Sequence, residues 1–123
     1  MLKLHRTSFN TILNNMFGVL DEFDARFAFP TVAAIAKMNP ELVKRIEEEG
    51  HEVASHGYNH VRYPTISVQA RQQDLLLSLQ VFKKMGVKIS GFRAPYDNYT
   101  DDMPELLEQA GLLWDGGFGF RPE

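Results

Sequence analysis

Residues 50–63 read GHEVASHGYNHVRY, a short apolar run followed by two histidines, His56 and His60, that stand four positions apart. The segment HEVAS at 51–55 has the pattern of a strand, so the first histidine comes directly after the strand ends. Gly57 favours a tight loop or a single turn between the histidines, and either can bring both imidazoles to one ion at about 2.0–2.1 Å. The alternative is a pair of structural histidines whose ring nitrogens bind backbone partners.

On both sides of this stretch, helical and extended patterns alternate. The apolar residues between Phe9 and Phe23 recur at helical spacing after the capping residue Ser8, and they predict a helix that packs on a sheet. The other expected elements are a strand at 26–31, a short helix at 32–38, a helix from an Asn39 cap and Pro40 to Gly50, the strand at 51–55, a helix from Ser67 to Met85, a strand at 87–92, a helix from Asp101 or Asp102 to Gly111, and a strand at 112–114. This order predicts an α/β fold with parallel strands alternating with helices.

Polar residues follow three of these strands directly, namely His56, Arg93 and Asp115. In parallel α/β folds the reactive groups collect at the carboxyl ends of the strands. In the segment GFRAPYDNY at 91–99, Pro95 fixes the turn that follows Arg93. A guanidinium in the mouth of a barrel needs a carboxylate partner, because an unpaired buried charge is very costly. The alternative is a surface salt bridge beside a rigid turn.

The composition limits the possible partners and ligands. The chain has 123 residues, which predicts one domain, and 44% of them are hydrophobic, which is enough for a core. Lys and Arg number 13 against 16 Asp and Glu, with no basic block, which argues against nucleic acid or an anionic membrane as a partner. No segment resembles a signal peptide or a membrane span, so we expect a cytoplasmic location. Cysteine is absent, so a metal must be held by histidine and carboxylate.

The segment GHEVASHGYNH at 50–60, followed about thirty residues later by GFRAPY at 91–96, resembles the polysaccharide deacetylases of the NodB homology type, or carbohydrate esterase family 4. The stretch PELVKRIEEEGHEVASHGYNH at 40–60 is similar to the second motif of that family with its lead-in, and GFRAPY is similar to its third motif. The stretch LLEQAGLLWDGG at 106–117 resembles the segment that follows, with glycines where the family often has serines. The resemblance covers the chain from about Leu20 to Asp115.

This resemblance implies a partial or distorted (β/α) barrel of the glycoside hydrolase and deacetylase type. It implies a divalent metal, commonly zinc, held by His56, His60 and an aspartate, and a reaction that removes acetyl groups from an N-acetylated carbohydrate. Arg93 and Tyr96 are the catalytic residues that it implies. Arg93 would hold the carboxylate that acts as base, and the backbone N–H of Tyr96 would stabilise the oxyanion.

Two parts of the family pattern have no counterpart in the sequence. The first motif, a Thr-Phe-Asp-Asp stretch that supplies the base and the third ligand, is absent, and the last motifs, with the acid histidine, would follow Glu123. We therefore expect residues 1–123 to form a single deacetylase-like domain truncated at both ends, with weak or no activity alone. The candidate substitutes for the third ligand are His5, Asp21, Asp24, Asp97 and Asp115, and Asp97 is the best placed because it adjoins the turn.

Three functions agree with these observations. The chain is part of a carbohydrate deacetylase, or it is a catalytically incomplete module that binds a sugar or a metal, or it hydrolyses a small amide or cyclic imide. In each case a partial barrel exposes sheet edges, which makes a homo-oligomer formed through those edges possible.

Overall fold

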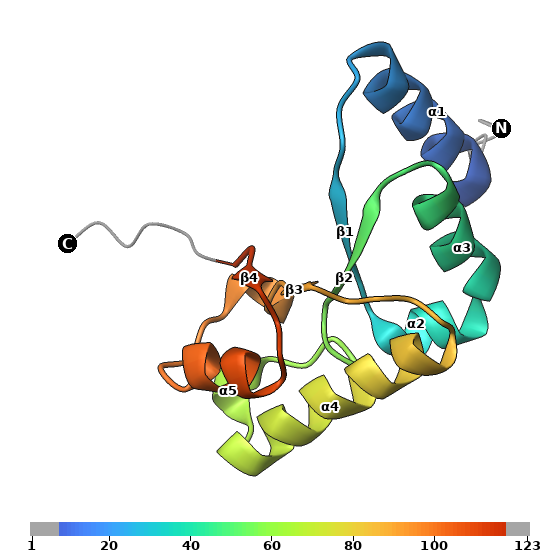
Figure 1. Ribbon diagram of the computed structural model, residues 1–123. Helices are drawn as coiled ribbons and strands as arrows, with labels where there is room; N and C mark the ends of the chain where they lie inside the picture. The colour runs from blue at the N-terminus through green and yellow to red at the C-terminus, as the bar shows by residue number, and fades with distance from the viewer. Residues whose placement is uncertain (1–7, 118–123) are drawn as a thin grey trace, which may run out of the picture.

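The computed structural model describes residues 8–117 as a parallel four-stranded sheet with its connecting helices (Figure 1). In chain order the elements are α1 (Phe9–Glu22), β1 (Ala28–Thr31), α2 (Ala33–Met38), α3 (Pro40–Glu48), β2 (Glu52–Ser55), the 3-10 turn η1 (Tyr63–Thr65), α4 (Val68–Lys84), β3 (Gly91–Phe92), the 3-10 turn η2 (Pro95–Asp97), α5 (Met103–Gln109) and β4 (Trp114–Asp115). The strands lie in the order β1-β2-β3-β4, and every neighbouring pair is parallel. The predicted α/β fold with parallel strands is therefore confirmed.

Side-chain caps start two of the predicted helices as expected. The hydroxyls of Ser8 and Ser67 each accept a hydrogen bond from the backbone N–H three residues on, at 3.2 and 3.1 Å. Asn39 is the N-cap residue of α3 and Pro40 occupies its first turn, as predicted, but the Asn39 side chain makes no capping hydrogen bond. The amide of Asn39 instead donates to the carbonyl of Ile35 at 3.0 Å. Because α2 ends where α3 begins, that carbonyl of the last α2 turn competes for the side chain.

The strands in the C-terminal half are shorter than the sequence predicts. Of the strand expected at 87–92, only Gly91–Phe92 forms strand β3, and the residues before it connect α4 to the sheet. Strand β3 meets β2 at a single pair, Ser55 with Phe92, which are the last residues of their strands. The next residues of the two strands, His56 and Arg93, therefore leave the sheet side by side.

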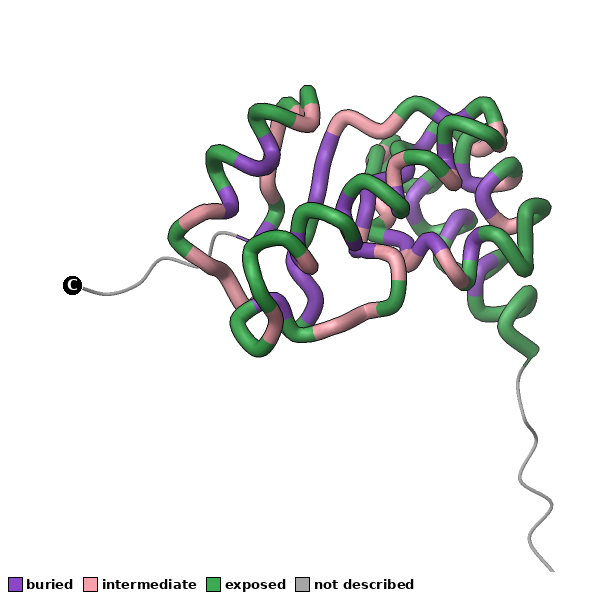
Figure 2. Tube along the Cα trace, turned by 90° about the horizontal axis from the view of Figure 1, so that it is seen from below, coloured by how far each residue is buried: buried purple, intermediate pink, exposed green. Residues whose placement is uncertain are grey.

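The interior is built from two hydrophobic clusters, and Figure 2 shows in purple the buried positions that alternate with exposed ones along the chain. The first cluster joins α1, α2, α3 and the end of α4 to β2, and its buried members are Leu13, Phe17, Leu20, Ala33, Ala36, Val43, Ile46, Val53, Phe82 and Val87. The second joins α4 and α5 to β3, and its buried members are Tyr63, Leu75, Phe92, Ala94, Met103, Leu106 and Leu107.

The apolar face of α1 is only half covered, which corrects the expectation that the whole face packs on the sheet. Of the apolar residues between Phe9 and Phe23, only Leu13, Phe17 and Leu20 are buried, while Phe9 and Phe23 are 62% and 73% exposed. Helix α1 lies beside β1, the edge strand of the described sheet, and its first turn is exposed along its whole circumference (Figure 2). Periodicity predicted the helix correctly, but it carries no information on how much of an apolar face finds a partner.

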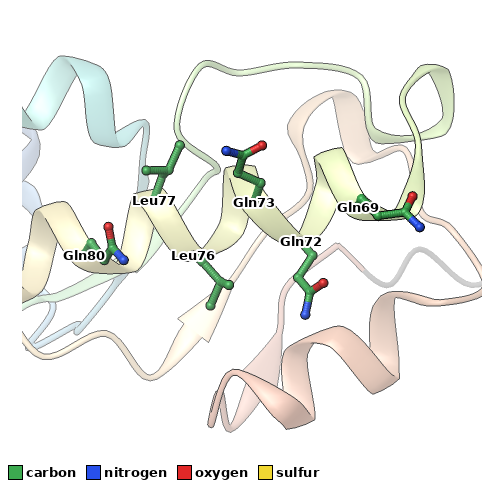
Figure 3. Close-up of a pocket in the computed structure, with 6 residues that line it drawn as sticks. All are labelled: Gln69, Gln72, Gln73, Leu76, Leu77 and Gln80. Atoms are coloured by element: carbon green, nitrogen blue, oxygen red, sulfur yellow. The ribbon is translucent and has the colours of Figure 1, made fainter.

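Helix α4 has an exposed outer face, which is mainly polar, and a buried inner face, which also carries polar side chains. The exposed residues that line a shallow hollow on this outer face are drawn in Figure 3, namely Gln69, Gln72, Gln73, Leu76, Leu77 and Gln80. The buried residues of the helix are Arg71, Asp74, Leu75, Ser78 and Phe82. Within residues 8–117, none of the helices has the length and apolar character that crossing a membrane requires.

The buried hydroxyls of Ser55 and Ser78 hydrogen-bond to each other at 2.7 Å and connect β2 to α4. We expect Ser78→Ala to lower the free energy of unfolding by about 1–3 kcal/mol, because the Ser55 hydroxyl loses a buried partner. In urea denaturation, the double variant Ser55→Ala/Ser78→Ala should lose less stability than the two single variants added together. Strict additivity would show that the two hydroxyls act independently.

Candidate functional site

The end of β2 places His56 against the end of β3. The backbone N–H of His56 donates to the Thr31 carbonyl at 3.1 Å, and the Arg93 N–H donates to the Ser55 carbonyl at 3.0 Å. The Nδ1 atom of His56 lies 2.7 Å from the Arg93 carbonyl oxygen. A carbonyl can only accept, so Nδ1 carries the proton and Nε2 of the neutral ring keeps its lone pair. This tautomer leaves one ring nitrogen available as a metal ligand.

The structure brings the ring of His60 next to that of His56. The two ring centroids lie 4.8 Å apart at an interplanar angle of 54°. The loop between them turns through two left-handed residues, Gly57 at φ 75° and His60 at φ 56°. A left-handed conformation is uncommon for a residue with a side chain, and it brings the second ring back toward the first. The proximity that the spacing suggested is therefore present in the structure.

Burial lowers the pKa of His56, and the neighbouring His60 and Arg93 lower it further through their positive charge. The hydrogen bond to the Arg93 carbonyl and the charge of Asp97 act in the opposite direction but do not cancel the effect. Burial therefore favours the neutral form of His56, which is the form that can bind a metal.

Arg93 lies at the surface and binds Asp97 through two hydrogen bonds. Its Nε and Nη2 donate to the two carboxylate oxygens at 2.8 and 3.1 Å, and the two side chains are 45% and 57% exposed. Within the described residues, the structure thus shows a solvent-exposed salt bridge beside the Pro95 turn, which is the alternative that the sequence left open for Arg93. The hydrogen bond from Arg93 lowers the pKa of Asp97, and Asp97 in turn raises the pKa of Arg93.

Tyr96 sits in the same turn in a left-handed conformation, at φ 60° and ψ 13°. Its ring centroid lies 4.6 Å from that of His60, and the Arg62 guanidinium carbon lies 4.2 Å from the centroid of the Tyr96 ring. Among residues 8–117, no acceptor is found for the backbone N–H of Tyr96. The Tyr96 ring thus packs beside His60, and its backbone N–H has no acceptor in the described part of the chain.

The described part of the chain contains no group of three or more His, Cys, Asp or Glu side chains placed to hold one metal ion. Asp97, the best placed substitute for a third ligand by sequence, is held by Arg93 and does not join the histidines. Asp115 in β4 accepts the Gly117 N–H at 2.8 Å, Asp21 belongs to α1, and Asp24 follows that helix. His5 lies outside the described residues.

Sequence reasoning missed the groups that hold the histidine loop from α4. The carboxylate of Asp74 accepts hydrogen bonds from the backbone N–H groups of Tyr58 and Asn59 and from the Tyr63 hydroxyl. Burial and the negative charge of Asp74 raise the pKa of Tyr63, so that its hydroxyl stays a donor. In the sequence, the one local sign of this role was that Asp74 stands next to Leu75, a residue of the apolar face of the predicted helix.

The sheet topology defines a class: an α/β protein with parallel strands, in which His56 and Arg93 directly follow the carboxyl ends of the neighbouring strands β2 and β3. Residues 7–113 match the family model described as Polysaccharide deacetylase. The chain belongs to the polysaccharide deacetylase family, as the resemblance of its two central motifs predicted.

The curated relatives include a peptidoglycan-N-acetylglucosamine deacetylase of Bacillus cereus, which is 27% identical over 107 residues, or 85% of this chain and 50% of the relative. A crystal structure from Mycobacterium smegmatis assigned to the polysaccharide deacetylases matches 84% of this chain and 36% of its own, with a TM-score of 0.78 and 30% identity. The partial (β/α)-barrel fold is thereby confirmed.

A third similar structure is a family 4 carbohydrate esterase pseudoenzyme from Bacillus anthracis, with a TM-score of 0.80 and 19% identity over 89% of this chain and 39% of its own. At that identity the likeness concerns the fold alone. The chain thus spans half the length of the Bacillus cereus relative and less than half of each of the two solved structures.

Proposed function

We propose that this chain supplies part of a divalent-metal site, with zinc as the ion, in a hydrolase that removes N-acetyl groups from a carbohydrate. Family membership supports the reaction class. The observation that carries the proposal is the close pair of imidazoles, of which His56 has its Nδ1 proton bound to the Arg93 carbonyl. A ligating histidine commonly donates its other ring N–H to a backbone carbonyl or carboxylate, which fixes the ring for the metal.

The residues present fit two of the protein ligands of such a site. His56 and His60 would hold the ion through ring nitrogens, and the lowered pKa of His56 favours the ligating form. Catalytic zinc sites usually have three protein ligands and a water, and residues 8–117 bring no third candidate to the pair. The third ligand is therefore expected from outside the described residues.

When bound, a zinc ion supplies Lewis acidity toward the acetyl carbonyl and lowers the pKa of a coordinated water. The backbone N–H of Tyr96 would donate to the oxygen that becomes negatively charged as the amide carbon turns tetrahedral. Arg93 would orient a carboxylate that accepts the proton of the attacking water, and within the described residues it holds Asp97 in its ionised form. Pro95 would keep this donor and the guanidinium on one rigid turn.

A second candidate function is a binding module of the same fold that does not turn over substrate. The observation that favours it is the lack of a group of three metal-binding side chains in residues 8–117. Acetate release from an N-acetylglucosamine oligomer with added zinc separates the two functions. Turnover by the purified chain excludes the binding module, whereas oligomer binding without acetate supports it.

Zinc titration of the purified chain tests the ligand assignment directly. We expect His56→Ala and His60→Ala each to weaken zinc binding at least about 100-fold, because loss of a ligand should exceed the 10–100-fold cost of losing a group that supports one. Asn59→Ala is the matched control, since Asn59 is exposed in the same loop and the variant keeps the backbone N–H that the loop uses. Equal zinc affinity in the two histidine variants and the control would refute the assignment.

A further inference from the structure

We propose that Asp74 is a positioning residue that holds the His56–Gly57–Tyr58–Asn59–His60 loop in the shape that brings the two imidazoles together. The proposal rests on the proposed function of the histidine pair, and it adds a residue from α4 that contacts neither ring. On this proposal, the Asp74 carboxylate raises the metal affinity of His56 and His60 by holding the loop between them.

The contacts of Asp74 are directed at the middle of the loop. Asp74 is 9% exposed, and its Oδ2 accepts from the Tyr58 N–H at 2.9 Å and from the Tyr63 hydroxyl at 2.8 Å. Its Oδ1 accepts from the Asn59 N–H at 3.3 Å. Both oxygens accept and neither donates, which is the pattern of an ionised carboxylate. One side chain thus binds two successive amides between the two histidines.

Three further backbone groups of this loop have hydrogen-bond partners, two of them on α2. The carbonyls of Gly57 and Tyr58 accept from the N–H groups of Ala33 and Ala34 in the first turn of α2, both at 3.0 Å. The Gly57 N–H donates to the Ser55 hydroxyl at 3.3 Å. The loop is therefore fixed between the amino end of α2 and the carboxylate on α4, and it has few other conformations that satisfy these groups.

A charged acceptor suits this position better than a neutral one. Hydrogen bonds to an ionised acceptor are shorter and stronger than neutral ones, and three donors converge on this carboxylate. Loss of the carboxylate would leave two partly buried amides without acceptors, and the loop would have to rearrange to hydrate them. Because His60 holds an uncommon left-handed conformation, we expect such a rearrangement to move its ring away from His56.

The experiment compares Asp74→Ala, Asp74→Asn and Tyr63→Phe with Asp102→Asn in the full chain. Asp102 is the matched control because its carboxylate also pairs with a buried polar side chain of α4. Its Oδ2 atom lies 3.1 Å from Nε of Arg71. The Asp102 variant should lose stability without changing the loop amides. Zinc affinity is measured by calorimetry, and amide hydrogen exchange of Tyr58 and Asn59 is measured by NMR on the metal-free chain.

We expect Asp74→Ala to weaken zinc binding about 10- to 100-fold and to speed exchange of both amides. Asp74→Asn should cost only several-fold, since one oxygen is kept, and Tyr63→Phe, which leaves both amides bound, should cost less than Asp74→Ala. If Asp74→Ala does not fold, the Asn variant takes its place in the comparison. Asp102→Asn should change zinc affinity by less than about two-fold.

Protected amides in Asp74→Ala, or a zinc affinity equal to that of Asp102→Asn, would overturn the positioning role. The exchange measurement needs no metal, so it judges the loop separately from the proposed function. If His56→Ala left zinc binding unchanged while Asp74→Ala exposed the amides, the metal assignment would fail and the structural support of the loop would stand. In that case the contribution of Asp74 to metal affinity would be refuted.

Discussion

Replacing Gly57 with alanine is expected to lower the free energy of unfolding by about 2–5 kcal/mol and to remove most of the zinc affinity of the histidine pair. Gly57 has a φ of 75°, and a Cβ atom there would lie 2.7 Å from the Asp74 carboxylate oxygen and 3.5 Å from the Tyr63 hydroxyl. The new methyl group thus adds backbone strain at this position and pushes away the Asp74 carboxylate that binds the loop amides. Urea denaturation and zinc titration measure the two effects.

The matched control is Gly86→Ala. Gly86 has nearly the same backbone conformation, at φ 74°, but nothing lies within 4 Å of the position that a Cβ atom would take. The control therefore reports the backbone strain alone, about 1–2 kcal/mol. A second check is the double variant Gly57→Ala/Asp74→Ala, which should be less destabilised than the sum of its parts because the clash is gone. Equal losses in Gly57→Ala and Gly86→Ala would show that the carboxylate does not restrict this position.

Replacing Gly91 with alanine is expected to destabilise the fold by about 3 kcal/mol or more. A Cβ atom on Gly91 would overlap the six-membered ring of Trp114, which packs over β3 from the neighbouring strand β4. Either β3 and β4 must move apart, or the Trp114 indole must leave its packed position. Both changes cost much of the packing energy of a large aromatic side chain. Leaving would also break the 3.0 Å hydrogen bond from Trp114 Nε1 to Glu52.

Trp114 is the only tryptophan in the sequence, so intrinsic fluorescence reports its environment directly. We expect a red-shifted emission in Gly91→Ala together with a lower midpoint in urea. Gly18→Ala is the control, because Gly18 lies within α1 and an added Cβ atom would meet nothing within 4 Å. Alanine there should stabilise the helix by roughly 0.5–1 kcal/mol. Unchanged stability and emission in Gly91→Ala would show that the indole does not pack on this glycine.

Much of the fold could be predicted from local signals. The serine caps, the helical periodicity of α1 and α4, and the alternation of helix and strand each depend on residues close in sequence. The strands β3 and β4 were predicted too long or displaced, since the extent of a strand depends on where a neighbour pairs with it. The single β2–β3 pair at Ser55 and Phe92 is such a case.

The candidate site divides in the same way. The spacing of His56 and His60, and their place after a strand, were readable as a candidate ligand pair, and the structure brings the rings within 4.8 Å of each other. The partner of Arg93 was not readable, because the sequence contains many carboxylates and the turn geometry selects Asp97. The contribution of Asp74 was hidden, since an acid on a helix is usually solvated.

The sequence by itself therefore determined the α/β class, the order of elements, the family and the two histidines that follow β2. Periodicity, capping and motif spacing are properties of neighbouring residues, so they are available before folding. Only the tertiary structure decided that the Arg93–Asp97 pair lies at the surface, that α1 keeps half of its apolar face exposed, and that α4 places Asp74 under the histidine loop. These features depend on which distant segments pack together. A local sequence pattern shows which side chains could be buried, but not which other segment buries them.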